Sequence, residues 1–320
     1  MKTKAFTLLA GGLLFLNSLA QQDAGFSQYF FNQLEINPAY AGSREAFSGT
    51  LINRTQWYGM QGSPETQSIN MNGPVPNSRV GLGLQIYNDQ EGPMRNTGVQ
   101  ATYSYYIPVG SYKLAFGLQG ALNDLTIFGN QLVLENKNDP VFPTTVASSL
   151  VPDASFGIYL YKNRFYAGAS ATHLLEPKFG DNNTLMSEAA ITEPAMFYRH
   201  YYLISGIVFK LNEIVDLRPS IQITYVPAAP VNIGYNASLI FYQKYFAGIG
   251  MRTAPRIGME GTDNVFIAMI EYEVGTRFRI GASYDSYLNA TQQYNNGTFE
   301  LMLGWDLNIS KTNIVNPRFF

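Results

Sequence analysis

The chain has 320 residues and a formal net charge of −2 at pH 7, with 46% hydrophobic and only 14% charged residues. It contains no cysteine, which excludes disulfides, thiolate metal sites and a lipid-modified cysteine, and it has no basic excess of the kind that nucleic-acid binding requires. An ordinary soluble domain carries about 25% charge, so low charge with 22 tyrosines, 21 phenylalanines and 29 glycines fits a sheet that meets lipid on one face. Beyond the first residues no apolar run reaches about 18 residues, so no transmembrane helix is predicted.

Residues 1–20 have the pattern of an export signal. Lys2 and Lys4 give a positive start, and residues 5–16 are mostly apolar. Ser18 and Ala20 place small residues at the two positions that determine cleavage. We therefore predict a cleaved signal peptide and a mature chain that begins at Gln21.

Residues 21–43 are rich in aromatic residues but do not alternate. A disordered tail would be poorer in aromatics, so we expect a periplasmic N-terminal segment that packs, either as a plug in a barrel lumen or against a periplasmic partner. We assign Asn37, Pro38, Tyr40 and Gly42 to the folding of this segment. Contact of these four residues with a partner protein is the alternative role.

Residues 44–309 repeatedly alternate between apolar and polar side chains, which is the period of a β-strand. In one such run, Phe299, Leu301 and Leu303 alternate with Glu300 and Met302. One face is apolar and aromatic, and the other is polar and rich in glycine. The pattern predicts about fourteen strands of roughly ten residues, the length that crosses a bilayer when tilted. Their expected centres are Thr50, Ile69, Leu84, Tyr103, Leu118, Ile158, Ala169, Ile207, Ile221, Tyr235, Ile249, Ile267, Ile280 and Leu303.

The connections between these strands alternate between short and long. Every second connection is short, at residues 73–78, 109–111, 162–163, 212–213, 243–244 and 275. The others are mostly longer, at 88–96, 125–152, 174–198, 253–263 and 286–297, and only 226–230 is short. Outer-membrane barrels have short periplasmic turns and long extracellular loops. The sequence thus predicts an all-β, transmembrane antiparallel barrel in the outer membrane, with both termini periplasmic and a C-terminal tail at residues 310–320.

A secreted β-sandwich is the competing fold, since it also alternates and also carries a signal peptide. Its outer faces would be charged, whereas the polar face here is rich in glycine, serine, asparagine and threonine. Loop lengths in a sandwich would also have no reason to differ between the two ends. Both features favour the barrel.

Seven charged residues are predicted to lie on the lumen face near the C-terminal end of the chain. They could form a selectivity lining or a docking surface for a plug, or they could pair with one another inside a closed barrel. Mixed signs on adjacent strands favour mutual pairing. The residues are Arg218, Glu271, Glu273, Arg277, Arg279, Glu300 and Asp306.

No catalytic, cofactor or metal site is predicted. His173 and His200 are the only histidines and each is expected where a strand meets a loop, with no nearby sequence pattern of metal ligands. Nucleophile-elbow and phosphate-loop motifs are absent, and neither histidine has an evident serine partner. Trp57 and Tyr58 are expected at the outer end of the first strand, as interfacial anchors or as part of a docking surface.

Several motifs make the chain similar to the PorP/SprF family of outer-membrane proteins of the type IX secretion system. The most specific is Gln28-Tyr29-Phe30-Phe31-Asn32 followed by residues 37–42 (NPAYAG), and the similarity covers essentially the whole mature chain. Further similar motifs are Arg54-Thr55-Gln56-Trp57 with Gly62-Ser63-Pro64, Leu114-Ala115-Phe116-Gly117, and the ending Asn316-Pro317-Arg318-Phe319-Phe320.

The resemblance implies a non-enzymatic barrel of the type IX protein secretion and gliding machinery. It also implies partners besides outer-membrane lipid: a secreted, adhesin-like protein with a C-terminal sorting domain, and secretion components that include periplasmic ring lipoproteins. The barrel would be the adaptor or surface anchor for the adhesin. A diffusion channel or hydrophobic-substrate transporter is the alternative, since fourteen strands can enclose a pore. An outer-membrane enzyme is a third alternative, which would need a serine, histidine and acidic set on the lipid face or rim.

Overall fold

The computed structural model describes residues 23–44, 46–131, 146–178, 196–227, 229–255, 262–275 and 277–307. The predicted signal peptide, residues 1–20, and the predicted C-terminal tail, residues 310–320, lie outside the described residues. In the part of the chain that is described, no helix is both long enough and apolar enough to cross a membrane.

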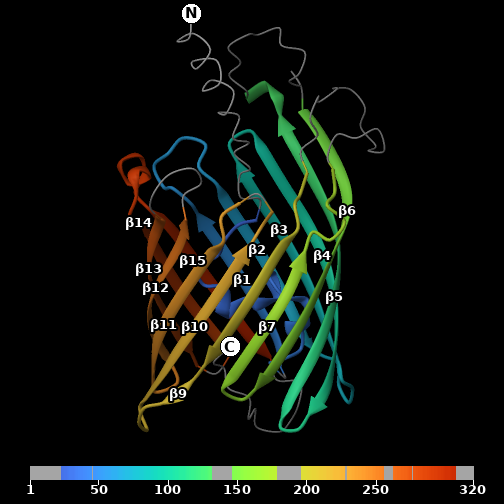
Figure 1. Ribbon diagram of the computed structural model, residues 1–320, viewed down its shortest axis with the longest axis vertical. Helices are drawn as coiled ribbons and strands as arrows, with labels where there is room; N and C mark the ends of the chain where they lie inside the picture. The colour runs from blue at the N-terminus through green and yellow to red at the C-terminus, as the bar shows by residue number, and fades with distance from the viewer. Residues whose placement is uncertain are drawn as a thin grey trace, which may run out of the picture.

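The described strands form one antiparallel sheet that closes into a barrel (Figure 1). Closure occurs where β15 (Thr298–Leu307) pairs with β1 (Phe47–Thr55). The short β9 (Phe209–Lys210) continues β8 (His200–Ile207) beyond Val208, and both pair with β10 (Val215–Tyr225), so the barrel has fourteen strands. The others are β2 (Glu65–Pro74), β3 (Val80–Glu91), β4 (Met94–Val109), β5 (Tyr112–Phe128), β6 (Val146–Lys162), β7 (Phe165–Thr172), β11 (Asn232–Phe241), β12 (Tyr245–Pro255), β13 (Thr262–Val274) and β14 (Phe278–Tyr287).

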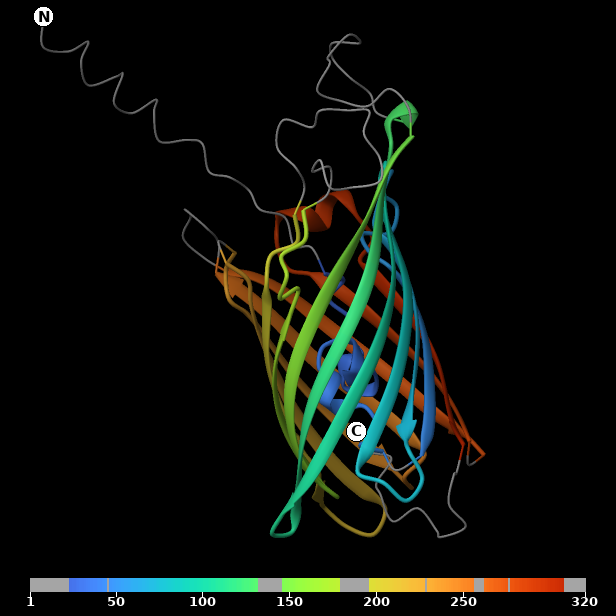
Figure 2. The same ribbon diagram turned by 90° about the vertical axis from the view of Figure 1, so that its right-hand side faces the viewer.

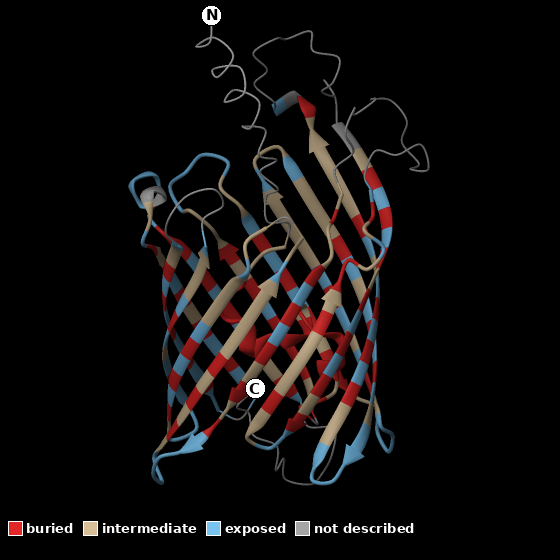
Figure 3. Cartoon of the chain, in the orientation of Figure 1, coloured by how far each residue is buried: buried red, intermediate tan, exposed pale blue. Residues whose placement is uncertain are grey.

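The predicted fold is therefore confirmed, and each of the fourteen predicted strand centres lies in a strand. Side chains alternate between the two faces of the barrel wall, visible as alternating bands along the strands in Figure 3. On β15, Leu301 and Leu303 are exposed on the outer surface, whereas Glu300 and Met302 are buried in the lumen. The outer face is apolar because it meets lipid hydrocarbon, which offers no partner to a polar group.

The two rims of the barrel differ in their connections. One rim, here the loop rim, carries connections 56–64, 92–93, 129–145, 173–199, 226–231, 256–261 and 288–297. The other, the turn rim, carries 75–79, 110–111, 163–164, 211–214, 242–244 and 275–277. One predicted long loop, 88–96, is instead almost entirely strand, with Gly92 (φ 54°) and Pro93 as a tight turn. Strands β5 and β6 are also longer than predicted, and they rise above their neighbours at the loop rim (Figure 2).

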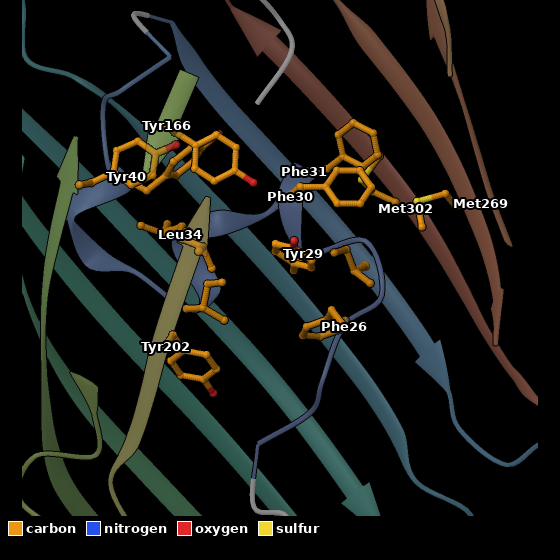
Figure 4. Close-up of a cluster of buried hydrophobic side chains, with 14 of the residues drawn as sticks. Phe26, Tyr29, Phe30, Phe31, Leu34, Tyr40, Tyr166, Tyr202, Met269 and Met302 are labelled. Atoms are coloured by element: carbon orange, nitrogen blue, oxygen red, sulfur yellow. The ribbon is translucent and has the colours of Figure 1, made fainter. Parts of the chain in front are cut away.

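Residues 23–44 lie inside the barrel, and we refer to them as the plug segment (Figure 2). They form three short 3-10 helices, η1 (Tyr29–Phe31), η2 (Gln33–Glu35) and η3 (Pro38–Tyr40). Figure 4 shows their aromatic side chains packed against lumen residues such as Met269 and Met302. Full burial of one large apolar side chain is worth about 1.5–3 kcal/mol, so a cluster of this size holds the segment in the lumen. The buried apolar residues of the segment are Phe26, Tyr29, Phe30, Phe31, Leu34, Ile36, Ala39, Tyr40 and Ala41.

The plug segment runs from the loop rim to the turn rim. At its start Asp23 contacts His173, which follows β7 at the loop rim, and at its end Arg44 contacts Asp306 near the turn rim. The described chain thus begins at the loop rim and ends, at Leu307, at the turn rim. The sequence predicts a periplasmic segment at residues 21–43 and both termini on one side. The described ends do not share a rim, because the chain crosses the barrel once as the plug segment before its fourteen strands.

Candidate functional site

The plug segment is attached to the barrel wall through the motif that begins at Asn37. Asn37 caps η3 by accepting a hydrogen bond from the Ala39 backbone N–H at 2.9 Å. Its Nδ2 donates to the carbonyl oxygen of Ile158 on β6 at 3.1 Å. Pro38 occupies the first helical position, where its missing N–H has no cost. Both residues are buried in the lumen, where they position the plug segment.

Tyr40 and Gly42 complete this contact. Tyr40 is buried and packs edge-on against Tyr159, with ring centroids 5.7 Å apart. Gly42 has a φ of +75°, and an added Cβ would lie 2.8 Å from the Cα of Gly81, so only glycine fits. The four candidates Asn37, Pro38, Tyr40 and Gly42 therefore lie in the interior and not on an outer surface that a partner could reach.

Substitution of Gly117 tests how closely the plug segment approaches the wall. An added Cβ at Gly117 would lie 2.2 Å from the Ala39 backbone N, whereas at Gly120, on the same strand, it would meet nothing within 4 Å. We expect Gly117→Ala to lower the free energy of unfolding by about 1–3 kcal/mol through overpacking. Gly120→Ala is the matched control and should change it by less than about 0.5 kcal/mol. Urea unfolding in detergent measures both, and equal effects of the two variants would contradict this close contact.

A buried charged cluster holds the first part of the plug segment. Glu300 accepts hydrogen bonds from the backbone N–H of Ser27 at 2.7 Å and of Gln28 at 3.1 Å. Arg54 on β1 pairs with Glu300 and, at 3.4 Å, with Asp285 on β14. The Ser27 hydroxyl donates to Asp285 at 2.7 Å. The cluster therefore links three barrel strands to the plug segment.

Arg218 makes a different contact with the plug segment. Its guanidinium lies over the rings of Phe30 and Phe31, at 4.3 and 4.6 Å from the ring centroids. Such cation–π contacts are stronger when the cation is removed from water, and Arg218 is almost fully buried. The aromatic rings of the plug segment thus pack against the guanidinium of Arg218.

The remaining lumen charges lie toward the turn rim. Arg279 lies 3.6 Å from Asp306, which also pairs with Arg44 of the plug segment at 3.0 Å. Glu271 and Glu273 are buried on β13. The lumen charges thus pair with one another and also contact the plug segment.

The prediction that Arg277 lies on the lumen face is wrong. Arg277 is exposed and belongs to the β13–β14 turn, because β14 begins only at Phe278. Conversely, Arg54 and Asp285 are lumen charges that the sequence prediction missed. Alternate residues of a strand share a face. On β1, Arg54 shares the lumen face with Ser48 and Thr50, and on β14, Asp285 shares it with Arg279. The alternation along each strand could therefore have identified both as lumen charges.

Trp57 and Tyr58 lie at the loop rim, as expected for the end of the first strand. The Trp57 ring is partly buried and lies 6.4 Å from the ring of Tyr287. The Tyr58 ring is 55% exposed and contacts Phe299 edge-on at 5.7 Å. Of these two residues, Tyr58 offers the larger surface that a partner protein can reach.

The two histidines come together with Asp23 where the plug segment enters the lumen. The rings of His173 and His200 lie 5.6 Å apart between centroids. His173 Nε2 lies 2.8 Å from Asp23 and its Nδ1 lies 2.5 Å from Asp153. Burial lowers the pKa of His173, but Asp23 and Asp153 outweigh it and raise the pKa to about 10. The sequence places the two histidines at the two ends of one predicted loop, residues 174–198, but no local signal connects them with Asp23.

Two cavities adjoin this cluster. The larger, of about 210 Å³, lies toward β8, β10, β11 and β12 and is lined by Asp23, His200, Gln222 and Arg252, among others. The smaller, of about 50 Å³, is polar and is lined by Asp23, Glu35, Asp89 and His173, among others. Both lie beside the plug segment, whose aromatic residues fill the middle of the lumen.

Comparison with known proteins agrees with this architecture. Among solved structures, the chain is similar to the CymD monoaromatic hydrocarbon channel (TM-score 0.50, 9% identity, 86% of this chain and 91% of that one). It is also similar to a TodX deltaS2S3 mutant monoaromatic hydrocarbon channel (TM-score 0.50, 10% identity, 86% and 94%). At such low identity these likenesses concern the fold alone.

No curated protein sequence matches the chain significantly. A family model does match, described as type IX secretion system membrane protein PorP/SprF, and it covers residues 18–305. That range includes the plug segment and nearly the whole barrel, and the family is one of secretion-associated membrane barrels and not an enzyme class. The chain therefore belongs to the PorP/SprF family of type IX secretion system outer-membrane barrels.

Proposed function

We propose that this barrel is a non-enzymatic adaptor or surface anchor of the type IX secretion and gliding machinery, which holds a secreted, adhesin-like protein at the cell surface. The observation that carries the proposal is the plug segment. Its aromatic residues are buried in the lumen, and it is hydrogen-bonded to Glu300 and Ile158 on different parts of the wall. A lumen filled in this way does not suit free diffusion, so the surfaces left for function are the two rims.

On this proposal the loop rim is extracellular and the turn rim periplasmic, as loop length in outer-membrane barrels suggests. The secreted protein, through its C-terminal sorting domain, would bind at the loop rim, where Tyr58 and Tyr294 are 55% and 68% exposed. Exposed tyrosines are favoured as energetic anchors of protein interfaces. Secretion components, including the periplasmic ring lipoproteins, would reach the turn rim.

The alternative is a diffusion channel or hydrophobic-substrate transporter. The 210 Å³ cavity beside the plug segment favours it, because a cavity of this kind could admit a small molecule from the loop rim. Passage through the barrel would still require the plug segment to leave the lumen.

An affinity pull-down tests the proposal. The tagged protein is isolated from detergent-solubilised outer membranes and its partners are identified by mass spectrometry. We expect one large secreted protein with a C-terminal sorting domain, together with secretion-ring lipoproteins. The double variant Tyr58→Ala, Tyr294→Ala should recover at least about tenfold less of the secreted protein, given that an interface anchor is worth about 1.4 kcal/mol or more.

Tyr242→Ala is the matched control, because Tyr242 is 64% exposed but lies at the turn rim. It should leave recovery of the secreted protein unchanged. A barrel recovered without any protein partner would contradict the adaptor role and favour the transporter. Recovery that falls equally in the control would contradict the loop rim as the docking surface.

A further inference from the structure

The start of the plug segment lies in a cluster of potential metal ligands at the loop rim. One ligand atom from each of Asp23, His173 and His200 lies within 4.8 Å of the other two. His173 Nε2 is 2.8 Å from Asp23 Oδ1, and His200 Nδ1 is 3.9 Å from Asp23 Oδ2. Ligand atoms bound tetrahedrally at about 2.0–2.1 Å from a zinc ion lie roughly 3.3 Å apart, so the 2.8 Å between His173 Nε2 and Asp23 Oδ1 is close to the separation in a zinc site.

A carboxylate outside this group orients one of the ligands. Asp153 lies 2.5 Å from His173 Nδ1, which directs the other ring nitrogen, Nε2, toward Asp23. A histidine that binds a metal through one nitrogen commonly donates its other N–H to a carboxylate in this way. Tyr202 similarly donates a hydrogen bond to Asp23 Oδ2 at 3.0 Å. The potential ligands are therefore held by further contacts from β6 and β8.

His200 adds an independent observation. It is only 1% exposed, and its Nδ1 lies 3.0 Å from the Tyr198 carbonyl oxygen, which can only accept a hydrogen bond. The N–H is therefore on Nδ1, and the nitrogen available to a metal is Nε2, which has no hydrogen-bond partner among the described residues. A buried nitrogen without a partner is unfavourable, because burial removes its hydrogen bond to water and nothing replaces it. The polar cavity of about 50 Å³ beside Asp23 and His173 has room for a water molecule, which a three-ligand site needs as its fourth ligand.

We propose that Asp23, His173 and His200 bind a divalent transition-metal ion of the zinc class, with Asp153 as the residue that positions His173. Two imidazoles and one carboxylate suit zinc, whereas calcium and magnesium prefer oxygen ligands alone. The ion would join the first residue of the plug segment to the end of β7 and the start of β8. The cluster thereby fixes the plug segment at the loop rim, at the end opposite its contact with Asp306.

The competing interpretation is an ion-pair cluster without metal, in which a protonated His173 lies between two carboxylates. The composition of the chain makes the metal site and the metal-free ion-pair cluster easy to distinguish by experiment. It has two histidines and no cysteine, and both histidines lie in the cluster. A full-length barrel with a histidine-free affinity tag therefore carries no other imidazole or thiolate that could bind zinc or cobalt.

The test is zinc binding by the full-length barrel in detergent, after removal of metal with a chelator. We expect one zinc ion per barrel by elemental analysis, and a cobalt(II) absorption spectrum of tetrahedral type that zinc abolishes. Titration calorimetry should show zinc affinity at least about tenfold weaker in His200→Ala and in Asp23→Asn. Asp153→Asn should weaken it by about 10–100-fold, as removal of a positioning carboxylate does.

Asp89→Asn is the matched control, since Asp89 lines the same 50 Å³ cavity but is not a proposed ligand. It should bind zinc as the unchanged protein does. Absence of stoichiometric zinc in the unchanged barrel would overturn the proposal in favour of the ion-pair cluster. So would zinc affinity that survives in His200→Ala or falls equally in Asp89→Asn. The result for the unchanged barrel stands even if a variant does not fold.

Discussion

Deletion of residues 23–43 is expected to turn a closed barrel into an open pore. The barrel should still form, because the described strands pair only with one another and the plug segment contributes none of them. Without the segment, the lumen loses the aromatic residues that occupy its middle, including Phe30, Phe31 and Tyr40. A fourteen-stranded barrel encloses more space than its own inward side chains fill, so water and ions should then pass.

Planar-bilayer recording measures this effect. The unchanged protein should show no large stable conductance, whereas the deletion variant should show discrete, long-lived steps. Heat-modifiable migration in gel electrophoresis serves as the control that the variant barrel is folded. A peptide of residues 23–43 added to the open variant should lower its conductance. A large stable pore in the unchanged protein would contradict the plugged lumen and support the channel alternative.

Arg54→Met is expected to cause a larger loss of stability than Gly117→Ala. Arg54 is 1% exposed, and its loss would leave Glu300 buried without its cationic partner and Asp285 with only the more distant Arg252, at 4.0 Å. Removing one member of a buried ion pair costs about 3–5 kcal/mol, because the remaining charge is left in a medium of low dielectric constant. The plug segment should loosen as well, since Ser27 and Gln28 bond to the same carboxylates.

Urea unfolding, followed by fluorescence of the two tryptophans, measures the change in unfolding free energy. Lys210→Met is the matched control: Lys210 pairs with Glu213 at 2.7 Å, but both side chains are exposed, so we expect no measurable loss of stability. The triple variant Arg54→Met, Glu300→Gln, Asp285→Asn should recover part of the loss, because it removes the uncompensated charge. Equal effects of Arg54→Met and Lys210→Met would show that the buried cluster does not hold the barrel and the plug segment together.

The strands could be predicted from the sequence because their signal is local. Successive side chains of a strand point to opposite faces, so lipid on one side and a polar, glycine-rich lumen on the other produce a period of two directly. This pattern places Leu301 and Leu303 outward and Glu300 inward, and the structure agrees. Errors arose at strand ends, as for Arg277 and the predicted loop 88–96, because alternation does not show where pairing stops.

The sequence indicated that the plug segment packs, but not where it packs. The aromatic residues Phe26 to Phe31 indicated packing, but the same residues would suit a lumen or a partner protein. The choice between them depends on which surface offers complementary contacts. Here Met302 and Arg218 supply them from strands distant in sequence, and the glycine at position 117 leaves room for the backbone of η3.

The sequence by itself thus determined the barrel, its strand number, its outward and inward faces, and the family, since each rests on local periodicity or on a contiguous motif. Only the tertiary structure decided the course of the plug segment, the opposite rims of the described chain ends, and the meeting of Asp23 with His173 and His200. Asp23 and His173 lie 150 positions apart along the chain. Their proximity follows from barrel closure and from the burial of the plug segment, and neither leaves a signal in the residues that flank them.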